Sequence, residues 1–361
     1  MRPSTMTHCR ACGSDRMFLF LPMGRHPPAN MFVRPEDVDQ PQSALALNTQ
    51  TCLDNGMIEE ADQIPEGFVR HDLHILPDAA TMHGHFEGLA AVLTERAAKN
   101  GVQVHVACFD PETADEVRAL HGPAQVISTT TTLEHIGDLV GRMDGINGSL
   151  ADDGWFVIDI RRGREIPATR QFDDVYHEHL SEMRPHSLAD RTGMAVVDVI
   201  RLPVHGGSVR VFIRKPTSAA PPSPEIIRTP AEEDGAAFKA LAARAHAVGD
   251  ALRGLLAGLK AEAARIAGRG APAKGNTLPN FFDLGTGTQD YRVDRNPLEQ
   301  GFLSPGKRLP IHDPAVIADN PPDSLLVLAR TFFDGFRTQL AGDGVAGGRP
   351  ILPLPYPRIV I

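Results

Sequence analysis

Buried strands alternate with helices between residues 63 and 199, and this alternation most constrains the fold. The apolar runs Val102–Phe109 and Trp155–Ile160 predict strands. The three- and four-residue spacing of apolar residues in Phe86–Ala97 and Ala114–Leu120 predicts helices. Strands separated by helices imply a parallel sheet, because parallel neighbours need a crossover connection. The predicted fold class is therefore α/β.

The last part of the chain repeats this pattern after a proline-rich link at 216–230. A strand is predicted over Val209–Ile213, before the link. After it, apolar residues at helical spacing predict a long helix over Phe238–Ile266, with Gly268 and Gly270 as stop signals. Further strands are predicted at Tyr291–Val293, Leu325–Leu328 and Ile351–Leu354.

The first 62 residues form a separate, loop-rich segment. A segment this small needs a cross-link such as a bound metal, or a neighbouring domain to pack against, in order to fold stably. Cys9-x-x-Cys12-Gly13 and Cys52 suggest a zinc site. A second CxxC would begin at Cys52, but its last position is Asn55. The site is thus one ligand short, and His8 is the nearby candidate for the fourth. Without a fourth ligand, we expect weak zinc binding or a vacant site.

The chain has 361 residues, which fits two or three domains of ordinary size. The patterns divide it into a zinc-binding-like module at 1–62, a middle α/β domain at 63–199 and a C-terminal α/β domain at 200–361. Four cysteines in a chain of this length do not indicate a disulfide framework.

The formal net charge of -9 argues against a non-specific nucleic-acid binder, which would carry a basic excess. No run approaches the ~18 apolar residues that span a bilayer, and the N-terminus lacks the apolar core of a signal peptide. We expect no nucleic-acid partner, no membrane partner and a cytoplasmic protein.

The most concentrated polar cluster is Phe172–Leu180, which contains Tyr176, His177, Glu178 and His179. In a helix Tyr176 and His179 would share a face, and in a strand the two histidines would do so. Histidine titrates near neutral pH, so one interpretation is a general base with orienting partners. The alternatives are a metal site at His177 and His179 and a solvated polar turn.

Three weaker clusters follow. His205–Arg210 contains a glycine pair that lets backbone approach a ligand, but it also suits an ordinary turn. Ala273–Thr277, with Asn280, offers backbone N–H groups and the Lys274 charge to an anion, although a plain loop is the simpler interpretation. Asp283–Gly287 looks like a cofactor glycine loop, but without a leading strand we interpret it as a turn.

Taken together and in order, these motifs resemble the S-adenosylmethionine-dependent C-methyltransferases of nucleotide-linked 4-keto-deoxysugars, of the sugar 3-C-methyltransferase type. The resemblance implies an N-terminal zinc-binding module, a Rossmann-like methyltransferase domain and a C-terminal Rossmann-like domain that helps to hold the nucleotide sugar. Besides the cysteine and Phe172–Leu180 motifs, it is carried by Pro28-Ala29-Asn30, Thr81-Met82, His85-Phe86, Pro203–Arg210, Ala273–Leu278, Asp294–Pro297, Pro305-Gly306 and Pro310-Ile311.

The resemblance also implies roles for individual residues. His179 would be the base that forms a sugar enolate, Tyr176 and Glu178 would orient it or stabilise the enolate, and His135 would face the sugar. Asp110 would bind the ribose of the cofactor. The nucleotide sugar would be held by His205, Lys274, Asn276, Asn280 and Arg295, and zinc by Cys9, Cys12 and Cys52.

The sequence departs from this family where the methyl donor should bind. The first strand and its glycine loop, expected between Phe86 and Asp110, are missing, and the methyltransferase domain is therefore shortened. A further stretch is missing between Gly122 and Thr129. The smaller departures are replacements of residues that the family usually carries. In this chain His71-Asp72-Leu73-His74 replaces a tyrosine and serines, Asn55 replaces a cysteine, Glu299 replaces a lysine, and Arg330-Thr331 replaces an aromatic residue followed by asparagine.

We therefore expect weak or absent adenosylmethionine binding. Two hypotheses follow: an active sugar C-methyltransferase with a shortened cofactor domain, and a non-catalytic or decayed relative that binds a nucleotide sugar. A metal-dependent hydrolase that uses His177 and His179 is a third, weaker interpretation. We expect a monomer or a weak dimer.

Overall fold

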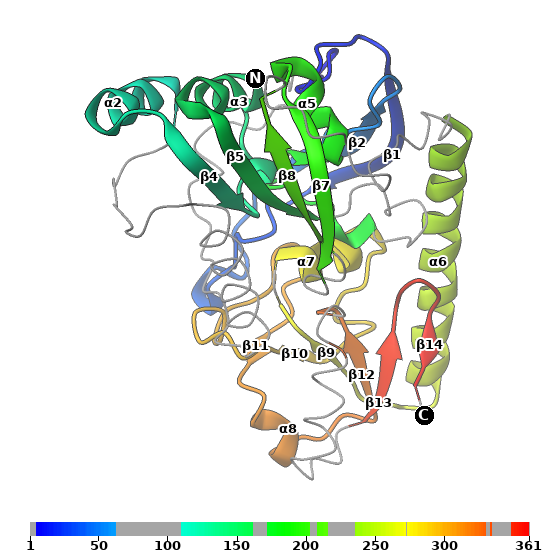
Figure 1. Ribbon diagram of the computed structural model, residues 1–361. Helices are drawn as coiled ribbons and strands as arrows, with labels where there is room; N and C mark the ends of the chain where they lie inside the picture. The colour runs from blue at the N-terminus through cyan, green and yellow to red at the C-terminus, as the bar shows by residue number, and fades with distance from the viewer. Residues whose placement is uncertain are drawn as a thin grey trace.

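The computed structural model describes residues 5–62, 110–161, 172–202, 208–215, 235–271, 273–329, 333 and 348–360 (Figure 1). These residues form three sheets with helices between and around them, which confirms the predicted α/β class. The predicted helix at Phe86–Ala97, the strand at Val102–Phe109 and the expected gap before Asp110 lie outside the described residues.

The first sheet is antiparallel and has the order β1-β2-β3-β6. Its strands are β1 (Met17–His26), β2 (Leu45–Cys52), β3 (Ile58–Glu60) and β6 (Ser181–Glu182), and the short 3-10 helix η1 (Pro35–Asp37) lies between β1 and β2. The last strand comes from the middle of the chain, so the N-terminal module is completed by a segment more than a hundred residues away.

The second sheet has the order β4-β5-β8-β7. Its strands are β4 (Ala124–Thr130), β5 (Leu150–Arg161), β7 (Ala195–Leu202) and β8 (Ser208–Arg214). The parallel β4 and β5 are connected through the 3-10 helix η3 (Leu133–His135) and α3 (Leu139–Ser149), whereas β8 and β7 are antiparallel. α2 (Pro111–His121) packs on α3, and α5 (Pro185–Thr192) precedes β7. This sheet continues past residue 199, where the middle domain was expected to end.

The third sheet has the order β11-β10-β9-β12-β13-β14, and only β14 is antiparallel to its neighbour. The strands are β9 (Ile266–Arg269), β10 (Tyr291–Val293), β11 (Ile311–His312), β12 (Ser324–Val327), β13 (Arg349–Leu352) and β14 (Arg358–Ile359), with α7 (Ala273–Phe281) after β9 and α8 (Val316–Asp319) before β12. The strand order reverses between β9 and β12. Such a switch point is where open α/β sheets bind ligands, outside the carboxyl ends of the strands.

The long helix α6 (Gly235–Ala261) ends earlier than predicted. Ala263 adopts the left-handed conformation (φ 60), Ala263 N–H donates to Lys260 O at 2.9 Å, and Ala264 N–H donates to Leu259 O at 3.0 Å. These bonds form a Schellman cap, which usually carries glycine at the left-handed position. Because alanine occupies it here, the stop has no sequence signal, and Ile266 and Gly268 belong to β9 instead.

The strands β2, β3 and β6 of the N-terminal sheet are covered on both faces, whereas β1 has exposed residues such as Leu19. Leu47 and Ile58 belong to a core that also contains the apolar face of α6 and residues of the third sheet. Cys52 and Met57 belong to a second core, shared with α3 and the second sheet. Figure 1 shows β1 beside α6, in agreement with their contacts. No helix in the described part of the chain is long and apolar enough to cross a membrane.

Two glycines of α6 test this packing as a matched pair. A Cβ at Gly249 would overlap the ring of buried Phe282, whereas a Cβ at Gly254 meets no atom within 4 Å. Alanine at an open helix position gains about 1 kcal/mol. We therefore expect Gly254→Ala to raise the free energy of unfolding by about 1 kcal/mol, and Gly249→Ala to lower it by about 1 kcal/mol because of overpacking. Urea unfolding followed by circular dichroism measures both, and stabilisation by Gly249→Ala would contradict the packing.

Candidate functional site

The polar cluster Phe172–Leu180 folds as a 3-10 turn, η5 (Phe172–Asp174), followed by a second tight turn. The His179 N–H donates to the Tyr176 carbonyl at 2.9 Å, so the segment is neither the helix nor the strand considered above. The turn brings the Tyr176 and His179 rings to 4.2 Å between centroids. His135, from η3, stands edge-on to His179 at 5.0 Å.

His179 pairs with a carboxylate that the sequence analysis missed. Nδ1 of His179 lies 2.9 Å from Oε1 of Glu182, and only 2% and 5% of these side chains is exposed. A carboxylate at Nδ1 favours the tautomer with its proton on Nδ1, which places the lone pair of the neutral ring on Nε2. Glu182 lies three residues after His179, in β6, and this i, i+3 spacing was the only sequence signal for the pair.

Glu178 connects this turn to the other two parts of the site. Its carboxylate accepts a hydrogen bond of 2.6 Å from Nδ2 of Asn30, which belongs to the Pro28-Ala29-Asn30 motif. Its backbone carbonyl lies 2.7 Å from Nδ1 of His135 and fixes that ring. The structure therefore brings together all four residues predicted to be catalytic.

The C-terminal domain reaches the same turn through the start of α7. The Thr277 hydroxyl donates to the Val175 carbonyl at 2.8 Å, and Nδ2 of Asn276 donates to the Ala29 carbonyl at 2.9 Å. Oδ1 of Asn276 accepts from the buried Arg292 at 2.6 Å. Asn276, which is 1% exposed, and Thr277 together tie the three parts of the chain to one another.

The other predicted substrate residues lie around this point or outside the described structure. Nδ2 of Asn280 donates to the carbonyls of Asn276 and Pro305. Lys274 is in the first turn of α7, but its side chain is not among those described, and His205 lies outside the described residues. Arg295 is exposed after β10.

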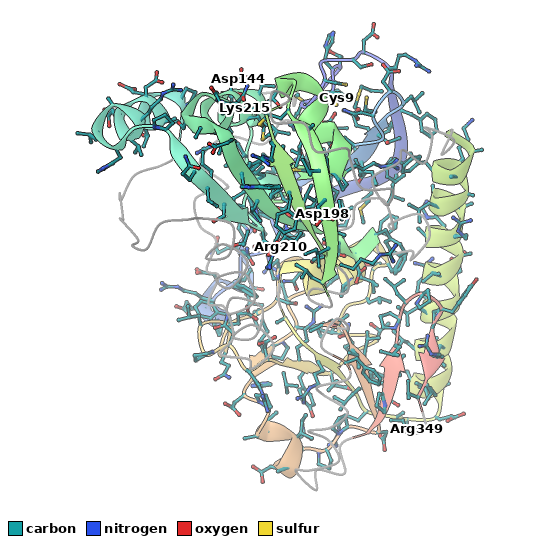
Figure 2. The ribbon with its side chains drawn as sticks, in the orientation of Figure 1. Cys9, Asp144, Asp198, Arg210, Lys215 and Arg349 are labelled. Carbon is teal, nitrogen blue, oxygen red and sulfur yellow. The ribbon has the colours of Figure 1, made fainter. Side chains whose placement is uncertain are left out.

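Arg210, from the motif Pro203–Arg210, serves the fold, and Glu299, one of the departures from the family, is buried. Arg210, labelled in Figure 2, makes a buried bidentate ion pair with Asp159, its cross-strand partner on β5, with bonds of 2.7 and 2.9 Å. Burial raises the pKa of Glu299 to about 8. At neutral pH this carboxyl is mostly protonated. The glutamate that replaces the family's usual lysine therefore adds little negative charge.

His177 differs from His179 in its surroundings. Its Nε2 lies 3.4 Å from the Leu45 carbonyl, and burial lowers its pKa from 6.5 to about 4. The two imidazoles therefore have different partners. Among the described residues, the one cluster of three or more potential metal ligands is formed by cysteines, so the structure does not support a metal-dependent hydrolase built on these histidines.

The shift of His177 predicts an acid-sensitive fold. The unfolded chain binds a proton near pH 6.5 and the folded chain only near pH 4, so stability falls as pH decreases through this window. We expect His177 to account for about 2 kcal/mol of lost stability between about pH 7 and about pH 5. Urea unfolding at both pH values should show a smaller loss for His177→Gln, whose amide keeps a donor for Leu45. An equal loss in both proteins would contradict this role.

The sulfur atoms of Cys9, Cys12 and Cys52 lie within 4.8 Å of one another. The hydrogen bond from Cys9, together with the backbone N–H groups of Asn55 and Asp54, lowers the pKa of Cys52 to about 5. Three converging thiol groups suit zinc, which favours sulfur ligands in tetrahedral sites. His8 does not join them: it is exposed and its Nδ1 hydrogen-bonds the Thr7 hydroxyl. The structure therefore does not place the candidate His8 at the fourth position.

Arg10, inside the cysteine knuckle, links this cluster to the histidine turn. Its Nη1 donates to the carbonyls of Leu180, at 2.8 Å, and Glu60, at 3.1 Å. The same guanidinium pairs with the buried carboxylate of Glu59 at 3.4 Å. The residue that follows His179 is thus held directly by the cysteine module.

Asp110 is the one described residue of the expected cofactor site. Its Oδ1 accepts from Thr113 N–H at 2.8 Å and caps α2, and this bond lowers the pKa of Asp110. A carboxylate that caps a helix with one oxygen retains the second oxygen as an acceptor. Asp110 can therefore still accept from a ribose hydroxyl. The structure does not bring it into the histidine cluster.

Comparisons with known proteins agree with this arrangement. Residues 203–355 match the family described as C-methyltransferase C-terminal domain, and residues 9–66 match the one described as "Putative zinc binding domain". C-methyltransferase NovU of Streptomyces niveus is 27% identical over 410 residues, covering 98% of this chain and 96% of the relative. Because this alignment is longer than the 361-residue chain, it opens gaps in the chain.

Proposed function

We propose that this chain, which is similar to C-methyltransferases with an N-terminal zinc-binding domain, methylates a carbon of a nucleotide-linked 4-keto-deoxysugar. The observation that carries the proposal is the buried pair of His179 and Glu182, with Tyr176 and His135 against the same imidazole. A carbon methyltransferase needs a base to create its carbon nucleophile, and this pair suits that task.

His179 acts as the base. A ketone acidifies the neighbouring C–H bond, and Nε2 of the neutral imidazole takes that proton to leave an enolate. Glu182 keeps the imidazole in the required tautomer and stabilises the imidazolium that forms, as an orienting carboxylate does in other His-based sites. Burial strengthens this ion pair, because water screens it little.

Tyr176 stabilises the developing charge on the enolate oxygen through its phenol O–H, because hydrogen-bond donors near developing charge are an effective catalytic device. Its ring centroid lies 4.2 Å from that of His179, and His135, edge-on to the same imidazole at 5.0 Å, faces the sugar. Glu178 orients this group: Asn30 holds its carboxylate, and its carbonyl holds His135 in place. The polar turn thus provides both a base and a hydrogen-bond donor for the enolate oxygen.

S-adenosylmethionine, when bound, supplies an electrophilic sulfonium methyl group. Asp110 is the described residue that would hold its ribose. The nucleotide sugar would lie toward the switch point of the third sheet, where α7 begins after β9. Lys274 and the backbone N–H groups of the first turn of α7 suit a diphosphate there, and Asn276, Asn280, Arg295 and His205 are the further residues that we assign to substrate binding.

Product analysis tests the proposed function. The protein is incubated with adenosylmethionine at high concentration and with nucleoside diphosphate-linked 4-keto-deoxyhexoses that differ in base and in deoxygenation. We expect one of them to gain a single methyl group on carbon, seen by mass spectrometry and located by NMR. Binding of such a sugar without any methyl transfer would support the non-catalytic alternative instead.

Glu182 provides a second test of the mechanism. Glu182→Gln removes the negative charge at Nδ1, so we expect kcat to fall about a hundredfold or more while KM changes little. Without the carboxylate the imidazolium is less stable, so the acidic limb of the pH–rate profile should move to lower pH. His177→Gln, in the same turn, is the matched control and should retain nearly wild-type kcat. Equal kcat in Glu182→Gln and wild type would exclude the orienting role.

The shortened cofactor segment predicts weak binding of the methyl donor. Calorimetric titration of the full-length protein with adenosylmethionine should give a dissociation constant in the millimolar range, or no measurable heat. The titration is repeated with adenosylhomocysteine and in the presence of the accepted nucleotide sugar. Tight, submicromolar binding to the free protein would show that other residues replace the missing glycine loop.

A further inference from the structure

The cysteine module contains two matching turns. In Cys9-x-x-Cys12-Gly13, Gly13 has φ 73 and its N–H donates to the Cys9 carbonyl at 2.9 Å. In Cys52-x-x-Asn55-Gly56, Gly56 has φ 67 and its N–H donates to the Cys52 carbonyl at 2.8 Å. Both turns end with a left-handed glycine, so the backbone places Asn55 in the second turn where Cys12 stands in the first.

The Asn55 side chain lies against the sulfur cluster. It is 4% exposed, and its Nδ2 and Oδ1 atoms lie 3.6 and 3.9 Å from the sulfur of Cys9. Oδ1 also accepts from Met57 N–H at 2.9 Å, which holds the amide in place. A carbonyl oxygen has two lone pairs and can therefore accept from Met57 and still coordinate a metal ion.

The neighbouring charged side chains are directed elsewhere. The Asp54 carboxylate accepts from the Ser14 hydroxyl at 2.5 Å and pairs with Arg16, and Glu59 pairs with Arg10. His8 is exposed, as described above. Among the described residues, no other histidine, cysteine or carboxylate joins the three sulfur atoms as a possible ligand.

We propose that zinc is bound here by the thiolates of Cys9, Cys12 and Cys52 and by the amide oxygen of Asn55. This ligand set has four members, as structural zinc sites require, although the fourth is a neutral oxygen donor. Three thiolates and Zn²⁺ carry a net charge of one negative unit, less than four thiolates would place in this buried region. A neutral oxygen is a weaker ligand than a thiolate, so zinc is bound but exchanges more readily than at four cysteines.

X-ray absorption spectroscopy of the full-length zinc protein tests the ligand set without any activity measurement. We expect three sulfur neighbours at about 2.3 Å and one lighter neighbour at about 2.0–2.2 Å. Asn55→Cys should convert this to four sulfur neighbours, because the matching turn already places the side chain correctly. Fewer than three sulfur neighbours, or a purified protein that takes up no zinc, would overturn the proposal.

Competition with a chromophoric chelator separates Asn55 from the other candidates for the fourth ligand. We expect Asn55→Ala to weaken zinc binding by about tenfold or more, Asn55→Cys to strengthen it by a similar factor, and His8→Ala to leave it unchanged. Unchanged affinity in Asn55→Ala would assign the fourth position to water, and a loss in His8→Ala would assign it to histidine; either result overturns the proposal. If Asn55→Ala does not fold, Asn55→Cys and His8→Ala still decide. These results do not depend on whether the protein transfers methyl groups.

Discussion

The pairing of β6 with β3 is the contact on which the site depends. Glu182 lies opposite Ile58, and Ser181 lies opposite Glu59, so a two-residue strand from the middle of the chain becomes the edge of the N-terminal sheet. Arg10 adds a hydrogen bond to the carbonyl of Leu180, immediately after His179. Because His179 and Glu182 stand at either end of this segment, the pairing fixes the distance between base and carboxylate. An isolated two-residue strand has too few hydrogen bonds to hold such a geometry.

The N-terminal sheet can provide this support because its strands β2, β3 and β6 are covered on both faces. One face packs with α6 and the third sheet, and the other packs with α3 and the second sheet. Asn30, from the same module, reaches Glu178, and Asn276 reaches the neighbouring Ala29 from the C-terminal domain. The polar turn is therefore a junction of three parts of the chain. The cysteine cluster belongs to this junction through Arg10, which gives the proposed metal site a structural role in holding the turn.

The sequence predicts local structure better than long-range partners. Strands such as Trp155–Ile160 and Val209–Ile213 follow from apolar runs, and both are confirmed within β5 and β8. The predicted end of α6 was wrong because the helix ends in a Schellman cap whose left-handed residue is Ala263, so no glycine marks it in the sequence. Glu182 was missed because its role depends on the pairing with β3, which no local pattern encodes. The different roles of His177 and His179 likewise depend on burial against Leu45 and on Glu182, and the proposed substrate contacts of Asn276, Asn280 and Arg295 remain predictions.

The proposed reaction depends on the removal by His179 of a proton next to a sugar ketone. The most direct measurement is hydrogen–deuterium exchange at that carbon, followed by NMR in D₂O with the nucleotide sugar and without any methyl donor, so that the result does not depend on cofactor affinity. If His179 is the base, the wild-type protein shows enzyme-dependent exchange and His179→Ala shows only background exchange. Exchange at the wild-type rate in His179→Ala would contradict this role.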